Sequence, residues 1–202
     1  FNHYIFDLDN TLIRETDYLF QAYKKIALDI SKNINVDSIE IENFLKINFI
    51  ENGRKNLFDK MLEHFKIKKF SIIDCLDILR NFDPCEISLF PELTKLLKHL
   101  SKDKDIIVLT NGNTIQQKNK VKNINWLNLY DKINFFYAND YQPKPSKKSF
   151  SVIEKKINIK SRKSTVMIGD SLSDKYFAKN CNISFVHVSQ LKEKMKCVEF
   201  SD

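Results

Sequence analysis

Glycine is scarce in this chain, which has only three glycines among its 202 residues. Average usage of about 7% would give roughly fourteen. A chain so poor in glycine is expected to keep it where the backbone needs an unusual φ angle or where another group approaches closely. Gly112 and Gly169 each lie just after a short apolar run. The sequence therefore predicts turns of demanding shape at these two positions.

Cysteine is also infrequent, and long apolar runs are missing. The four cysteines, Cys75, Cys85, Cys181 and Cys197, have no CxxC or zinc-type spacing. A chain of this length does not depend on disulfides for stability, so we expect reduced thiols and a cytoplasmic location. No apolar run approaches the ~18 residues that a membrane-spanning helix needs, so we expect no membrane partner.

Positively charged residues are in modest excess. There are 33 Lys and Arg residues against 26 Asp and Glu, a formal net charge of +7. The lysines are spread along the whole chain, and we find no helix-turn-helix or RNA-binding motif. We therefore expect no nucleic-acid partner. A lysine-rich composition and an attraction for phosphorylated substrates are both compatible with the excess.

Short apolar runs that end at polar residues predict the strands of a buried sheet. The predicted strands are 4–6, 106–109, 135–138, 166–168 and 185–188. Helical patterns at 91–100, 147–157 and 173–180 lie between them, which is typical of a parallel sheet covered on both faces. The alternation predicts a doubly wound α/β fold, whose ligands bind beyond the carboxyl ends of the strands.

Residues 14–90 interrupt this alternation. Four amphipathic helical stretches follow one another there, at about 17–31, 38–49, 55–65 and 72–82, with no buried strand between them. We expect an all-helical cap inserted into an α/β core made of residues 1–13 and 91–202. Because the insertion begins just after the first strand, we expect it to lie over the site as a lid that excludes water.

Polar residues follow successive predicted strands. They are Asp7 and Asp9 after the first strand, Thr110 after the second, Lys144 after the third, and Asp170 and Asp174 after the fourth. Clustered carboxylates repel one another unless a cation is present, and oxygen ligands suit Mg²⁺. A hydroxyl, a Thr-Asn-Gly turn and a lysine suit the oxygens of a phosphoryl group. The set predicts phosphoryl transfer.

Four motifs occur in a familiar order. They are DLDNT at 7–11, TNG at 110–112, KPS at 144–146 and GDSLSD at 169–174. The order resembles the motifs of the haloacid dehalogenase-like (HAD) hydrolase superfamily, and more narrowly its phosphatases with a helical cap after the first motif. The resemblance covers essentially the whole chain. It implies a Rossmann-like core and Mg²⁺-dependent hydrolysis of a small phosphorylated metabolite.

Carried over by position, the resemblance implies a catalytic role for each motif. Asp7 would attack phosphorus and form an aspartyl-phosphate. Asp9 would protonate the leaving oxygen and then activate the water that hydrolyses this intermediate. Thr110 and Asn111 would hold the phosphoryl oxygens, and Lys144 would neutralise charge on Asp7 and on the phosphate. Phosphoryl transfer needs mainly alignment and charge neutralisation, which fits these residue types.

The resemblance also implies a Mg²⁺ site. Asp7 and Asp170 would bind the ion directly, together with the peptide carbonyl of Asp9, and Asp174 would complete or orient that shell. An acid at position 9 favours a phosphorylated substrate, because the dehalogenating members of the superfamily lack one there. Arg54, beside Gly53 between two expected cap helices, and Arg14, just after the first motif, are candidate specificity residues.

Several alternatives stay open at this point. A phosphomutase or phosphotransferase of the same superfamily would pass the phosphoryl group to a substrate hydroxyl, and a phosphonate hydrolase would use a cap lysine. A receiver-like signalling protein also combines acidic residues, a threonine and a Lys-Pro pair on a doubly wound sheet, although its order of motifs differs. A protein of this fold could also bind ligands without turnover. The sequence identifies neither the substrate nor the oligomeric state.

Overall fold

The computed structural model describes residues 1–197, with a five-stranded parallel sheet at its centre. The strands are β1 (His3–Phe6), β2 (Asp105–Thr110), β3 (Ile133–Tyr137), β4 (Thr165–Gly169) and β5 (Ser184–His187). The strand order is β3-β2-β1-β4-β5, so β1 lies in the middle. Phe6 of β1 is in register with Val108 of β2 and with Ile168 of β4.

Helices connect the strands. They are α1 (Glu15–Ser31), α2 (Ser38–Asn52), α3 (Leu57–His64), α4 (Ile72–Asn81), α5 (Pro91–Leu100), α6 (Thr114–Asn123), α7 (Lys148–Ile157), α8 (Leu172–Cys181) and α9 (Val188–Cys197). Three short 3-10 helices are η1 (Tyr130–Lys132), η2 (Ala138–Asp140) and η3 (Arg162–Ser164). Local sequence explains where two of these helices begin. Pro91 is the first residue of α5, and the Asn113 side chain caps α6 by accepting from the Gln116 N–H.

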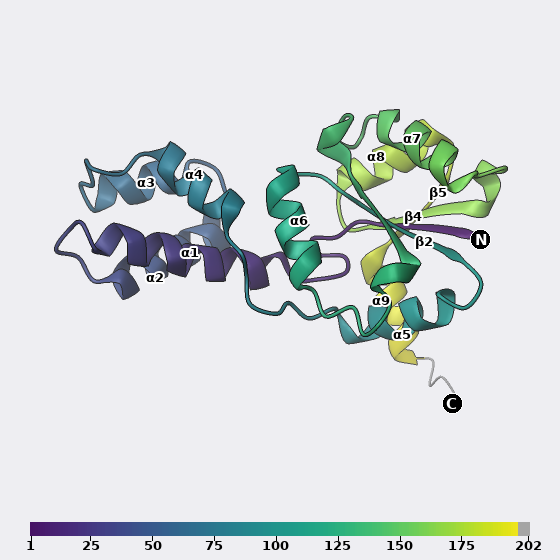
Figure 1. Cartoon of the computed structure of the whole chain (residues 1–202), viewed down its shortest axis with the longest axis horizontal. Coiled ribbons are helices and arrows are strands. Elements are labelled where there is room, and N and C mark those ends of the chain that lie inside the picture. Colours follow the sequence, from purple (N-terminus) through teal and green to yellow (C-terminus); the bar gives the residue numbers. More distant parts are fainter. Residues whose placement is uncertain (198–202) are drawn as a thin grey trace.

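Helices cover the sheet on both faces (Figure 1). Successive sheet residues alternate between two cores: Ile5 and Met167 belong to one, and Phe6 and Ile168 to the other. The first core is completed by α7 and α8, and the second by α5 and α9. Because apolar residues point to both sides, each strand is a continuous apolar run instead of an alternating one. The predicted doubly wound α/β fold is confirmed.

Helices α1 to α4 pack on one another beside the sheet (Figure 1). The Tyr18 hydroxyl of α1 donates to the carbonyls of Leu79 and Phe82, at 2.6 and 3.2 Å, which ties the start of this body to the end of α4. The apolar side chains of these four helices form one continuous cluster with one of the two sheet cores. Leu12 and Ile13 belong to the same cluster. Helix α6 lies between the four helices and the sheet.

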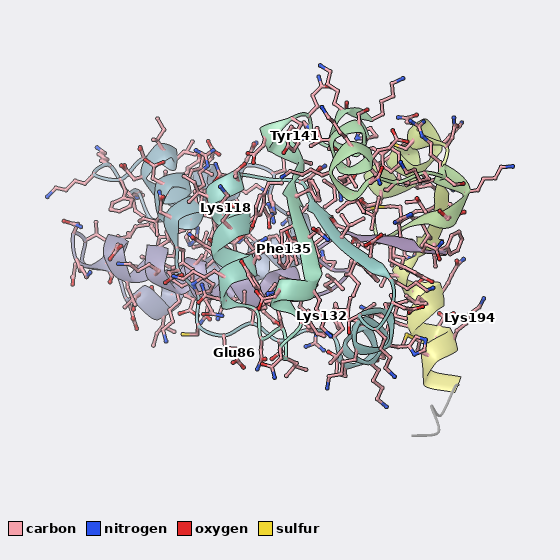
Figure 2. The ribbon with its side chains drawn as sticks, turned by 45° about the vertical axis from the view of Figure 1, so that its right-hand side comes forward. Glu86, Lys118, Lys132, Phe135, Tyr141 and Lys194 are labelled. Atoms are coloured by element: carbon pink, nitrogen blue, oxygen red, sulfur yellow. The ribbon has the colours of Figure 1, made fainter. Side chains whose placement is uncertain are left out.

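The edge strand β3 is covered by a turn that follows α6. The ring of Phe135 lies 5.1 Å from that of Trp126 and 5.1 Å from that of Tyr130, between ring centroids. Figure 2 labels Phe135 on this strand, with Lys132 at its start. The indole N–H of Trp126 donates to the Val121 carbonyl, so the turn is anchored to the end of α6.

Most predicted elements agree with the structure to within a few residues, and two helices were not predicted. Helix α6 lacks a regular apolar stripe, and its Ile115 is exposed, so periodicity gave no signal. Helix α9 begins at Val188, which the sequence interpretation had placed at the end of a strand. The strand predicted at 135–138 is shifted, because β3 starts at Ile133 and Ala138 opens a 3-10 helix.

The cysteines and the membrane prediction can be compared with the part of the chain that the structure describes. Cys75, Cys85 and Cys181 are free thiols, and the side chain of Cys197 lies outside the described residues. Among residues 1–197, no helix combines the length and the apolar character that crossing a bilayer requires.

Candidate active site

The carboxyl ends of β1, β2 and β4 meet around one cavity of about 220 Å³. Asp7 follows β1 directly, and its backbone N–H donates to the carbonyl of Ile168 in β4 at 2.9 Å. The cavity is lined by Asp7, Asp9, Asn10, Glu15, Thr110, Asn111, Lys144, Asp170, Ser171 and Ser173. The cavity lining therefore includes six of the nine predicted site residues. A further one, Asp174, is fully buried 2.7 Å from Lys144, and the other two are Arg14 and Arg54.

Lys144 lies at the centre of the site. Its ammonium donates to Asp7 Oδ1 at 2.5 Å and to the Leu109 carbonyl at 2.9 Å, and it lies 2.7 Å from Asp174 Oδ1. The residue is only 4% exposed. Burial alone would lower the pKa of Lys144, but Asp7 and Asp174 raise it above its ordinary value. Lys144 is therefore an ammonium held between two carboxylates.

Asp7, Asp170 and Asp174 form a cluster whose carboxylate oxygens lie within 4.8 Å of one another. Asp174 is fully buried on the first turn of α8. Its Oδ2 accepts from the N–H and the hydroxyl of Ser171, at 3.1 and 2.6 Å, in a capping box. Asp170 accepts from the Thr11 hydroxyl at 3.4 Å. The oxygens of this cluster are a donor set that suits a hard cation.

Burial changes the protonation of this cluster. It raises the pKa of Asp7 to about 7, against the lowering effect of Lys144 and with a further increase from Asp174. Burial also raises the pKa of Asp170, again with a contribution from Asp174. The three carboxylates therefore repel one another when all are ionised, although Lys144 is present. A bound divalent cation would remove this repulsion.

Gly169 is required by the close approach of Asp174. Its φ angle is not positive, but an added Cβ would lie 2.7 Å from the Cβ of Asp174 and still closer to its carboxylate. Gly112 has a φ of +122°, and an added Cβ there would lie 2.7 Å from Gln117 Nε2. Both predicted turns therefore need glycine. Gly169 is needed because Asp174 approaches closely, and Gly112 is needed because of its positive φ angle and the close approach of Gln117.

The loop after β2 and the loop that carries Lys144 are joined by one side chain. Asn111 Oδ1 accepts from the Lys144 N–H at 2.8 Å, and Asn111 Nδ2 donates to the Lys144 carbonyl at 3.0 Å. This reciprocal pair fixes the base of the lysine. Thr110 is 2% exposed, and its hydroxyl donates to the Asn111 carbonyl at 3.2 Å. The backbone of the Thr-Asn-Gly turn therefore borders the cavity in a fixed shape.

Asp9 also lines the cavity and has partners of its own. Lys120 Nζ lies 2.7 Å from both Asp9 oxygens, and Gln117 Nε2 donates to Asp9 Oδ2 at 3.0 Å. Both residues belong to α6. The Asp9 carboxylate is not part of the acidic cluster of Asp7, Asp170 and Asp174. Contact of its peptide carbonyl with a metal stays a prediction.

The two candidate specificity arginines lie in different surroundings. Arg54 pairs with Glu15, which lines the cavity at the strand ends. Arg54 itself lines a second cavity of about 330 Å³ between α1, α3, α4 and the start of α6. Arg14 instead lies over the Phe90 ring, 5.3 Å from its centroid. The structure thus places Arg54 at the boundary between two cavities, while Arg14 lines neither.

Sequence reasoning gave no role to Lys120, Gln117 and Thr11, nor to Asn10, Ser171 and Ser173 of the cavity lining. Lys120 and Gln117 are three positions apart on α6, which was not predicted as a helix. Their spacing after the Thr-Asn-Gly turn was the available signal, but nothing in the sequence separates a buried lysine from the many exposed ones. Thr11 was part of the first motif, and its fully buried hydroxyl was given no role.

Comparisons with known proteins agree with this geometry. A family model described as haloacid dehalogenase-like hydrolase matches residues 1–182. No curated protein matches the chain in sequence. A candidate β-phosphoglucomutase from Thermotoga maritima has 15% identity and a TM-score of 0.66, covering 98% of this chain and 100% of its own.

Two further solved structures are similar over most of both chains. A HAD phosphatase from Thermococcus onnurineus has 17% identity and a TM-score of 0.59, with 98% of each chain covered. The magnesium-bound candidate HAD hydrolase YfnB from Bacillus subtilis has 20% identity and a TM-score of 0.58, covering 92% of this chain and 87% of its own. At these identities the likeness establishes the fold.

Proposed function

Because the chain belongs to the haloacid dehalogenase-like hydrolase family, we propose that it hydrolyses a small phosphate monoester with Mg²⁺ as cofactor. The reaction would pass through an aspartyl-phosphate on Asp7. The observation that carries this proposal is the ion pair of Asp7 with the buried Lys144, beside the carboxylates of Asp170 and Asp174. Membership of this family also argues against the receiver-like alternative.

The residues present fit a magnesium ion. The cluster offers only oxygen ligands, and its three carboxylates and the Lys144 ammonium carry two negative charges in excess when all are ionised. Asp7, Asp170 and the peptide carbonyl of Asp9 would hold the ion. Asp174 would act through Lys144 and the start of α8, because one of its oxygens already caps that helix. Bound Mg²⁺ would supply charge neutralisation and alignment of the phosphoryl oxygens.

The chemistry of Asp7 and Asp9 follows from their positions. In the first step an Asp7 oxygen bonds to phosphorus while the bond to the leaving oxygen breaks, and Asp9 gives its proton to that oxygen. In the second step a water attacks phosphorus, the bond to Asp7 breaks, and Asp9 takes the water proton. Asp7 and Asp9 both line the cavity, so one carboxyl serves as nucleophile and the other as acid and base.

Lys144, Thr110 and Asn111 would bind the group that is transferred. Phosphoryl transfer is catalysed mainly by positioning and by balancing charge. Lys144 supplies a buried positive charge beside the nucleophile, and the turn of Thr110 and Asn111 supplies a hydroxyl and backbone N–H groups. The side chain of Asn111 is committed to the backbone of Lys144, so we assign its contribution to the phosphate to the backbone.

We further propose that residues 14–90 act as a cap that selects the substrate. The second cavity lies among α1, α3, α4 and α6, and the pair of Arg54 with Glu15 joins it to the catalytic cavity. A leaving group bound there would meet apolar side chains such as Leu76 and the guanidinium of Arg54. This supports a small phosphorylated metabolite as substrate. The free thiols of Cys75, Cys85 and Cys181 are in keeping with a cytoplasmic enzyme.

Phosphate release from a broad panel of phosphorylated metabolites tests the proposal. We expect release that EDTA abolishes and added Mg²⁺ restores, and that Asp7→Asn loses. Asp131→Asn is the matched control, because Asp131 is exposed and remote from the cavity. Equal rates for the wild type and Asp7→Asn would contradict the proposal. If the substrate is consumed, its phosphoryl group appears on a sugar hydroxyl and little free phosphate is released, the enzyme is a mutase or transferase and not a hydrolase.

A further inference from the structure

Lys120 is a fully buried lysine whose ammonium is directed at Asp9. The residue is 0% exposed, and its Nζ lies 2.7 Å from each Asp9 oxygen. Burying an ammonium is costly unless it is paired and hydrogen bonded. The motifs of the strand ends give a reason for Lys144, but they give none for a second buried lysine in contact with Asp9.

The contacts of α6 tie Lys120 to the phosphate-binding turn. Gln117, one turn earlier on the same helix, donates from Nε2 to Asp9 Oδ2 at 3.0 Å and to the Asn111 carbonyl at 2.9 Å. Its amide also occupies the space beside Gly112 that a Cβ would need. The position of Asp9 relative to the turn of Asn111 is therefore set by two side chains of one helix.

The other side of Lys120 is closed by the helical body. The Tyr18 ring lies 5.1 Å from Lys120 Nζ, measured to its centroid, in a cation–π arrangement. The Tyr18 hydroxyl is held by the carbonyls of Leu79 and Phe82 at the end of α4. Asn119 of α6 donates to the same Phe82 carbonyl at 3.0 Å. The ammonium is thus confined between Asp9 and an immobilised aromatic ring.

Asp9 needs such a partner because it stands among like charges. Asp7, Asp9 and Glu15 line the same cavity. Burial is the main cause of the raised pKa values of Asp7 and Glu15, and the charge of Asp9 raises both further. Without Lys120, the donor left to the Asp9 carboxylate from α6 would be Gln117, and repulsion from Asp7 and Glu15 would favour rotation away from them. The ammonium opposes this rotation because it donates to both oxygens of Asp9.

We propose that Lys120 is a positioning residue that aims Asp9 at the leaving oxygen and at the attacking water. The proposal rests on the proposed function, in which Asp9 gives a proton in the first step and takes one in the second. Lys120 keeps its own protons throughout and contacts neither substrate nor phosphorus. Its contribution is the orientation of Asp9. Loss of Lys120 should therefore lower the rate most for substrates whose leaving oxygen needs a proton.

A comparison of leaving groups tests this role. An alkyl phosphate leaves as a strongly basic oxygen that needs the Asp9 proton, while nitrophenyl phosphate leaves as a weakly basic one. General acid catalysis contributes about 10²–10⁴-fold. We expect Lys120→Met to lower kcat about 10²-fold with the alkyl ester and about 10-fold or less with nitrophenyl phosphate. Lys120→Arg should restore part of the loss, because it keeps the positive charge.

Matched variants separate positioning from a general loss of structure. Lys122→Met lies on the same helix, where its side chain is 69% exposed, and should leave both rates unchanged. In an Asp9→Asn background, Lys120→Met should change kcat less than about 3-fold, since the group that it positions is already gone. Equal losses for both esters, with the full loss repeated in the Asp9→Asn background, would overturn the proposal.

A stability measurement gives an answer that does not depend on turnover. In urea unfolding, Lys120→Met and Asp9→Asn should each lower the midpoint, and the double variant should lose less than the two losses added together. Additive losses would contradict the pairing of Lys120 with Asp9. The wild type could release no phosphate while the double variant still loses less stability than the two single losses added together. In that case the pairing of Lys120 with Asp9 would stand and the proposed function would fail.

Discussion

Lys144 and Asp7 form a buried ion pair, with 2.5 Å between Nζ and Oδ1, although they lie 137 positions apart in the chain. The pair joins the end of β1 to the loop after β3, and Asp174 of α8 extends it at 2.7 Å from the same ammonium. The ammonium of one lysine therefore connects three of the four motifs, and its backbone pairs with Asn111 of the remaining motif.

Lys144→Met should lower kcat by about 10²–10³-fold, the range found for loss of one donor that stabilises transition-state charge. The physical reason is that Asp7 and the phosphoryl group lose their shared positive partner. Steady-state kinetics with Mg²⁺ saturating measures it. Lys147→Met, in the same segment but exposed, is the control. Unchanged kcat in Lys144→Met would show that this lysine is structural only.

The raised pKa of Asp7 predicts how stability depends on pH in the absence of metal. Its folded pKa of about 7 exceeds the ordinary 3.8, so between these values the folded protein holds a proton that the unfolded chain has lost. The stability that this group contributes is present below about pH 3.8 and is lost as the pH rises through about 7.

Asp7→Asn should therefore be more stable than the wild type at pH 8 and nearly equal to it at pH 4, both with EDTA. One pKa unit corresponds to ~1.4 kcal/mol, so we expect a difference of at least about 1.4 kcal/mol at pH 8. Urea unfolding followed by circular dichroism at several pH values measures it. A wild type that stays more stable than Asp7→Asn across this range would refute the raised pKa.

Gly169→Ala tests the close packing of the fourth motif. The added methyl group would meet the Asp174 side chain, which would have to leave its place on α8. Overpacking of this kind costs about 1–3 kcal/mol, and we expect a loss of activity because Asp174 also pairs with Lys144. In the double variant with Asp174→Ala the clash disappears, so the two losses of stability should not add. Additive losses would contradict this explanation.

Much of the fold could be predicted because its strands are apolar on both sides. Asp7, Asp9, Thr110 and Asp170 were predicted to share one sheet edge, and each lines one cavity in the structure. Helix α6 escaped prediction because its buried residues include Gln117 and Lys120, which pattern analysis counts as exposed. A polar residue that is buried to hold another polar residue leaves no trace in hydrophobic periodicity.

The arginines show a different limit of sequence reasoning. Arg14 and Arg54 looked equivalent as candidates, but Arg54 lines the second cavity, while Arg14 lies over the Phe90 ring. We predict that Arg54→Ala raises KM for an anionic substrate about 10-fold, with Arg14→Ala as the control that leaves it unchanged. Kinetics on the best substrate of the panel measures both. A larger effect from Arg14→Ala would reverse the assignment.

A crystal structure with Mg²⁺ and beryllium fluoride, a mimic of a phosphoryl group bonded to a carboxylate, tests the central claim most directly. The account predicts beryllium bonded to an Asp7 oxygen, fluorides contacting Lys144 and the turn of Thr110, and the metal ion on Asp170. Beryllium on another side chain, or an Asp7 without any ligand while Mg²⁺ binds elsewhere, would contradict it.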